Sequence, residues 1–143
     1  MAECTIEHVK EIAKGCNVPE VVFLAVVDVP GNNYSTAVDE KPEVRLLTQA
    51  EQSQKKGAQE YLASVITAAK KDGLKAKSVV SEGNPADAII EYAEKNGVDL
   101  IVMSTHGRSG VTRFAMGSVT DKVIRTAVQP VLVVTPAECK VRT

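Results

Sequence analysis

The sequence predicts an α/β protein in which parallel strands form one sheet with helices on both faces. Segments of helical periodicity alternate with short apolar runs in the order α-β-α-β-α-β-α-β. The apolar runs are rich in β-branched residues, which is typical of strands that are buried on both faces. Strict alternation favours parallel strands joined by right-handed crossovers. Together these observations predict a doubly wound, three-layer α/β/α fold.

The length of 143 residues indicates one domain, which would span residues 1–143. The 17 basic residues nearly balance the 18 acidic ones, and no apolar run approaches the roughly 20 residues of a membrane span. We therefore expect a cytoplasmic protein without a nucleic-acid or membrane partner. The three cysteines have neither metal-ligand spacing nor an even count, so we expect thiols rather than disulfides, and no metal site.

The first half of the chain alternates helix, strand and helix. Ile6, Val9, Ile12 and Cys16 recur at helical spacing and predict a helix with one buried face. Residues 21–29 predict a buried strand, and residues 30–42 a long loop that acts either as a lid or as a solvated connection. A helix follows from about residue 44 or 48 to residue 71. Its inner stripe is expected to be Tyr61, Leu62, Val65, Ile66 and Ala69.

The next elements have clear boundary signals. Residues 75–81 predict a short strand. Asn84 is suited to cap a helix whose first residue is Pro85, and the pair at 96–97 is expected to end that helix. Its inward residues are expected to be Ile89, Ile90 and Ala93.

The last two strands, at residues 99–104 and 131–135, flank a glycine-spaced loop and a short helix. Ser118 occupies the expected N-cap of a helix over residues 119–127, and Asp121 would complete a capping box. Glycines let several N–H groups approach an anion, and a helix N-terminus adds further donors. Arg108 and Arg113 supply positive charge nearby. The loop is therefore either a phosphate site or ordinary helix punctuation, and its place at the carboxyl end of a parallel strand favours the site.

The positions Ser104, Gly107, Gly117 and Ser118 resemble the signature of the universal stress protein family. That signature is glycine, two residues, glycine, nine residues, glycine, then Ser or Thr. Here Ser104 stands in place of the first glycine, and the segment GNPADAIIEYAEKNGVD is similar as well. The resemblance implies an adenine nucleotide alpha hydrolase-like fold.

The resemblance also implies a ligand, ATP with or without Mg²⁺. Phosphate contacts are implied at Gly107, Gly117 and Ser118, and His106 either touches a phosphate or satisfies its own turn. Val26 and Met103 would lie near the adenine or ribose. The full candidate set is Val26, Met103, Ser104, His106, Gly107, Arg108, Gly117, Ser118, Val119 and Thr120.

One departure from the family concerns the sheet. Family members usually open with a central strand of the form ILVPxDGS, whereas this sequence starts within the helix that follows it. The resemblance implies that the sheet closes up, borrows a strand from another copy, or carries a gap.

Three functions remain open at this stage. The first is a nucleotide-binding regulatory protein of the stress-response type. The second is a non-nucleotide homodimerisation module on the same fold. The resemblance implies that it would pair through an edge strand at 131–135, and strand exchange is the alternative. A metabolic enzyme is the weakest alternative, because no set of Ser, His and acidic residues can be assembled and no carboxylate pair flanks the loop. We therefore expect a protein that is not an enzyme.

Overall fold

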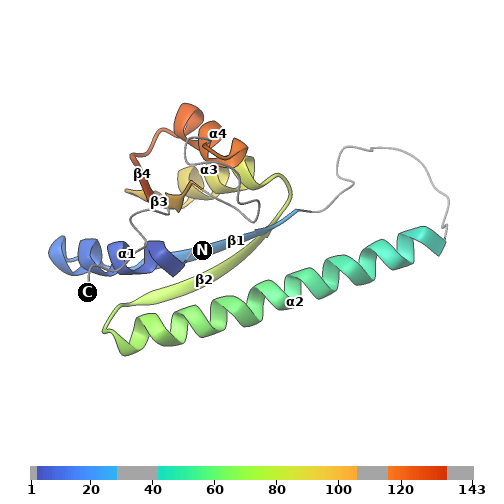
Figure 1. Ribbon diagram of the computed structural model, residues 1–143, viewed down its shortest axis with the longest axis horizontal. Helices are drawn as coiled ribbons and strands as arrows, with labels where there is room; N and C mark the ends of the chain where they lie inside the picture. The colour runs from blue at the N-terminus through green and yellow to red at the C-terminus, as the bar shows by residue number, and fades with distance from the viewer. Residues whose placement is uncertain (1–2, 29–41, 106–115, 135–143) are drawn as a thin grey trace. The chain divides into compact units, whose positions relative to one another are not determined.

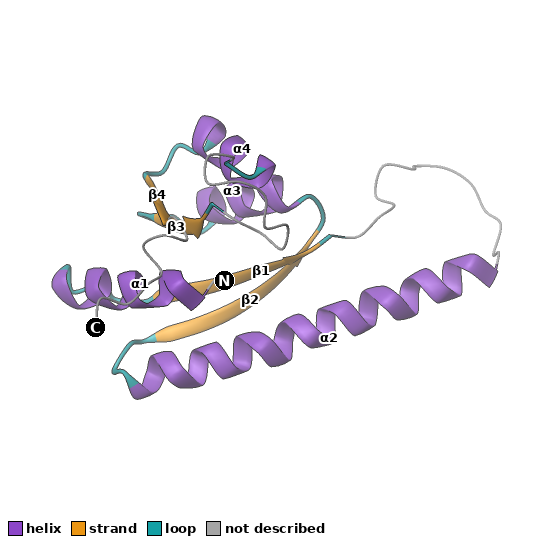
Figure 2. Cartoon of the chain, viewed as in Figure 1, coloured by secondary structure: helices purple, strands orange, loops and turns teal. Residues whose placement is uncertain are grey.

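The computed structural model describes residues 3–28, 42–105 and 116–134, and its elements follow the expected order (Figure 1). Helices and strands alternate along the chain, as the colours of Figure 2 show. The elements are α1 Glu3–Gly15, β1 Val21–Val27, α2 Pro42–Lys71, β2 Ala76–Glu82, α3 Pro85–Lys95, β3 Ile101–Ser104, α4 Ser118–Thr126 and β4 Val131–Val134. The loop expected at residues 30–42 lies outside the described residues, except that Pro42 begins α2.

The strands are parallel, as predicted. β1 pairs with β2, with Val21 opposite Ala76, and β3 pairs with β4, with Ile101 opposite Val131. The described strands make two two-stranded sheets, whereas the sequence predicted one continuous sheet.

The chain divides into two compact units. One comprises residues 1–19 and 89–143, and the other comprises residues 20–88. The first contains α1, β3, α4, β4 and most of α3, and the second contains β1, β2 and α2. Because each unit pairs two parallel strands, each meets the hydrogen-bonding needs of its own strands on one side.

In the unit of residues 20–88, α2 packs on both β1 and β2 (Figure 1). Leu62, Val65 and Ala69 are buried, as predicted. Tyr61 was expected in the same stripe, but its residue is 42% exposed, so that expectation is wrong. Ala69 and Leu62 lie seven positions apart and share a face, whereas Tyr61 is rotated by about 100° from Leu62. An exposed Tyr61 therefore follows from the helical period.

α2 begins earlier than either start that the sequence suggested. The helix runs from Pro42, and the residues described between 49 and 60 are mostly exposed. Its end agrees with the prediction: Gly73 has φ +83°, and Leu74 donates its N–H to the Ala69 carbonyl at 3.0 Å. This is the helix-ending pattern in which glycine takes the left-handed conformation.

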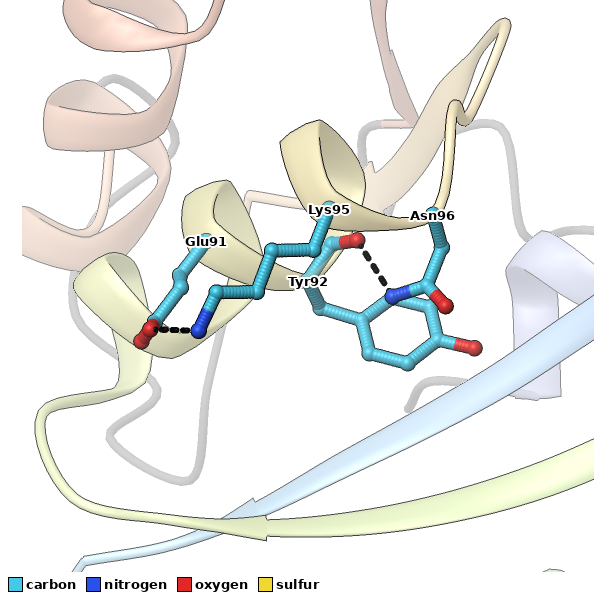
Figure 3. Close-up of polar contacts among 4 residues, drawn as sticks. All are labelled: Glu91, Tyr92, Lys95 and Asn96. Atoms are coloured by element: carbon cyan, nitrogen blue, oxygen red, sulfur yellow. Dashed lines mark hydrogen bonds and ion pairs between the residues drawn. The ribbon is translucent and has the colours of Figure 1, made fainter.

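Both ends of α3 agree with the prediction. The Asn84 side-chain oxygen accepts the N–H groups of Ala86 at 3.1 Å and Asp87 at 3.3 Å, and Pro85 is the first helical residue. At the other end, the Asn96 side-chain amide donates to the Tyr92 carbonyl at 2.9 Å (Figure 3). The helix then stops at the left-handed glycine that follows.

In the unit of residues 1–19 and 89–143, α1 packs on β3 and α4 packs on β4. Ala13 is buried on α1, whereas Cys16, expected in the same stripe, is exposed because the helix ends at Gly15. Val123 of α4 is fully buried, with 0% of its surface exposed. The buried Val123 therefore anchors α4 in the core of this unit.

Candidate functional site

The carboxyl end of β3 leads directly into the candidate site. Ser104 is the last residue of β3, and Thr105 continues the pairing because its N–H donates to the Val134 carbonyl at 3.2 Å. Thr105 is 8% exposed. The site therefore starts from a buried, hydrogen-bonded strand end.

Gly117, at the start of α4, contacts the end of β3. Its N–H donates to the Thr105 carbonyl at 3.2 Å, and a Cβ atom at position 117 would lie 3.1 Å from the same oxygen. Gly117 has φ −60° and ψ 149°, which any residue can adopt. The requirement for glycine is therefore close backbone approach, and positive φ plays no part.

The start of α4 differs from the prediction by one residue. Gly117 is the N-cap, Ser118 is the first helical residue, and no side chain makes a capping hydrogen bond. The proposed N-cap at Ser118 and its capping box with Asp121 are therefore wrong. Asp121 instead pairs with Arg125, one turn later, at 2.9 Å. Gly117, whose N–H is bonded to the Thr105 carbonyl, is the last residue before the helix and therefore occupies the N-cap position.

Three backbone donors stand at this helix start. The first intrahelical bond runs from the Asp121 N–H to the Gly117 carbonyl, at 2.9 Å. The N–H groups of Ser118, Val119 and Thr120 precede it, so the helix offers them no acceptor. Such a turn attracts anions through its donors and through the positive end of the helix dipole.

The three side chains of this turn have different surroundings. Ser118 is exposed, Val119 is half-buried, and Thr120 is 3% exposed. The Thr120 hydroxyl donates to the Ser104 carbonyl at 3.2 Å. Thr120 thus offers a ligand its backbone N–H, whereas Ser118 can offer both its N–H and its hydroxyl.

The structure brings together half of the predicted site residues. Ser104, Gly117, Ser118, Val119 and Thr120 meet at the β3 end and the start of α4. Met103 is half-buried on β3, one residue before Ser104. Val26 is half-buried on β1, in the other compact unit. The predictions for His106, Gly107, Arg108 and Arg113 lie outside the described residues.

Thr105 is a site residue that the sequence analysis missed. Its carbonyl receives Gly117, and its N–H extends the β3–β4 pairing. No periodicity marks it, because it follows the apolar run and precedes the glycines. The glycine at 117 is a sequence signal for close approach to another backbone segment, but the sequence does not say which peptide group it approaches.

Within the described ranges, no three His, Cys, Asp or Glu residues gather closely enough to hold a metal ion. Among the helices that the structure describes, none is long and apolar enough to cross a membrane.

Parallel strand pairs alternating with helices, and a helix start beside a strand's carboxyl end, define an α/β protein of the Rossmann-like class. The chain belongs to the universal stress protein family, because the Universal stress protein family profile matches residues 2–135. The family and the fold class that the sequence suggested are both confirmed.

Two relatives come from Methanocaldococcus jannaschii. Universal stress protein MJ0577 is 31% identical over an alignment of 148 residues with its gaps, and the alignment covers 93% of this chain and 86% of the relative. Universal stress protein MJ0531 is 46% identical over 80 residues, which cover 56% of this chain and 47% of that relative. The matched segment thus spans about half the length of MJ0531 and most of MJ0577.

Solved structures share the fold. The structure of MJ0577 has a TM-score of 0.79 with this chain at 28% sequence identity, covering 93% of this chain and 86% of that one. The universal stress protein from Archaeoglobus fulgidus in complex with dAMP has a TM-score of 0.56 at 23% identity, covering 92% of this chain and 86% of that one.

Proposed function

We propose that this protein is an ATP-binding regulatory protein of the stress response, in which the first turn of α4 holds the phosphates. Family membership supports a nucleotide ligand, since one fold relative was solved with dAMP. The N–H groups of Ser118, Val119 and Thr120 supply donors of the kind that phosphates require. Gly107 and Arg108 would contact the phosphates from the preceding loop, and His106 is a further candidate there.

The observation that carries the proposal is the absence of a side-chain cap at α4. If Ser118 served only to cap the helix, its hydroxyl would bind a backbone N–H of the first turn. Gly117 occupies that position instead, and Ser118 is exposed at the first helical residue. A hydroxyl placed there can donate to a phosphate oxygen beside the backbone donors.

The proposed activity is binding, not turnover, in the cytoplasm. The described part of this site, three backbone N–H groups and the Ser118 hydroxyl, can stabilise a phosphate but includes no side chain of the kind that acts as a general base. Mg²⁺, if it accompanies ATP, would be held mainly by the phosphates. Val26 and Met103 are the candidates for the base or ribose.

The proposal predicts that the purified protein binds ATP. Calorimetric titration with ATP, with and without Mg²⁺, is expected to show binding that weakens from ATP to ADP to AMP, because fewer phosphates reach the α4 turn. GTP is the matched control for the base, and the supernatant of heat-denatured protein is examined for adenine nucleotide. An empty supernatant together with no heat of binding for ATP would contradict the proposal.

A second candidate function is homodimerisation without nucleotide. Val128, which precedes β4, is 82% exposed, and Leu132, within β4, is 36% exposed; among the described residues β4 pairs on one side only. Exposed apolar residues along a strand edge favour pairing with another chain. Such a dimer would use the edge at residues 131–135, or exchange strands.

Dimerisation predicts a two-chain mass at micromolar concentration, measured by sedimentation with and without ATP. A Val128→Lys variant is expected to shift the equilibrium toward monomer. A single-chain mass for the unaltered protein at that concentration would rule out the dimerisation module.

A further inference from the structure

We infer that Thr120 is a positioning residue, whose hydroxyl sets the first turn of α4 against the end of β3 and so controls how tightly that turn binds phosphate. This inference rests on the proposed function. It assigns Thr120 an indirect role, whereas the family resemblance implied only that this residue flanks the phosphates.

Two hydrogen bonds join the strand end to the helix start. The Gly117 N–H donates to the Thr105 carbonyl and the Thr120 hydroxyl donates to the Ser104 carbonyl, each at 3.2 Å. Two consecutive carbonyls at the end of β3 therefore accept hydrogen bonds from two residues, Gly117 and Thr120, that lie three positions apart at the start of α4. We call these four residues, Ser104, Thr105, Gly117 and Thr120, the clasp.

Burial makes the clasp stiff. Thr105 is 8% exposed and Thr120 is 3% exposed, so water competes poorly for either bond. One turn along α4, Val123 is fully buried, which limits sliding of the helix along its axis. A single bond at Gly117 would still let the first turn pivot, and the second bond at Thr120 removes that freedom.

The clasp bears directly on anion binding. The donors of Ser118, Val119 and Thr120 lie between its two bonds, within one helical turn. Hydrogen bonds weaken steeply as their angles depart from linearity, so a pivot of this turn would misalign all three donors together. Donors held in place before the ligand arrives bind it without a further ordering cost.

The test compares Thr120→Val with Thr120→Ser. Valine keeps the branched shape and loses the hydroxyl, whereas serine keeps the hydroxyl. We expect Thr120→Val to weaken ATP binding about five- to tenfold and Thr120→Ser to change it less than about twofold. Thr126→Val is the matched control, because Thr126 is exposed at the last residue of the same helix.

Hydrogen exchange of the Gly117 amide, measured without nucleotide, tests the clasp separately. Thr120→Val is expected to speed this exchange, and Thr120→Ser to leave it near the unaltered rate. Unchanged exchange in folded Thr120→Val would overturn the clasp, whatever ATP does. Faster exchange with unchanged ATP affinity would overturn the positioning role. If the unaltered protein binds no ATP, the proposed function fails and the role in binding fails with it, while the exchange result still reports on the clasp.

Discussion

Replacing Gly117 by valine is expected to abolish measurable ATP binding and to lower the free energy of unfolding by about 1–3 kcal/mol. A Cβ atom at this position would lie 3.1 Å from the Thr105 carbonyl oxygen, closer than ordinary van der Waals contact. That oxygen cannot move away without weakening the bond that it accepts from the Gly117 N–H. The strain therefore falls on the segment that leads into the anion-binding turn.

Alanine at position 117 is expected to have a smaller effect on stability and on ATP affinity than valine. Gly117→Ala adds only the Cβ atom, so we expect a smaller loss of stability and a partial loss of affinity. Gly57→Ala is the matched control: Gly57 lies within α2, and a Cβ there would meet nothing within 4 Å. Alanine favours helix, so this control is expected to stabilise the protein by about 0.5–1 kcal/mol without changing affinity.

Chemical denaturation and calorimetric titration of the four proteins provide the measurement. If Gly117→Val unfolds at the same denaturant concentration as the unaltered protein and binds ATP equally well, then close approach to Thr105 does not explain the glycine.

Much of the fold could be predicted because local signals and packing agree. Asn84 and Pro85 start α3 by capping chemistry that depends only on neighbouring residues, and Gly73 ends α2 by its own backbone conformation. The start of α2 could not be placed. Its first half has few buried residues among those described, so no apolar stripe marks it.

The direction of the strands could be predicted, but their pairing could not. Parallel pairing follows from alternation of strands with helices, and both observed pairs are parallel. Which strands pair depends on long-range contacts that a sequence pattern does not contain.

The candidate site was predicted by spacing and corrected by backbone contacts. The spacing of the glycines located Gly117 and Ser118. It could not tell whether Gly117 is a glycine because an anion binds there or because the backbone packs closely there. The structure shows that the two residues have different environments. Gly117 is required by the Thr105 carbonyl, and Ser118 is left without a capping bond. Close packing therefore accounts for Gly117, and the phosphate role stays a proposal for Ser118.

Replacing Ser118 by aspartate is expected to change stability and affinity in opposite directions. A carboxylate in the first turn of a helix interacts favourably with the helix dipole, which is worth about 0.3–1 kcal/mol. The same charge repels a phosphate bound at that turn. At 4 Å this repulsion is about 1 kcal/mol in water and about 4 kcal/mol near a protein surface, which corresponds to a loss of affinity on the order of five- to several-hundredfold. A site in which Ser118 only supports the helix would show the first effect alone.

Ser118→Ala completes the test. Because no side chain caps α4, removing this hydroxyl is expected to change the free energy of unfolding by less than about 0.5 kcal/mol. ATP affinity is expected to fall about tenfold, through loss of one hydrogen bond to a charged group. Ser53→Asp, at an exposed position of α2, is the control for added charge and is expected to leave affinity unchanged. Thermal unfolding and titration of these variants separate the two roles, because capping predicts a loss of stability with unchanged affinity in Ser118→Ala, and phosphate binding predicts the reverse.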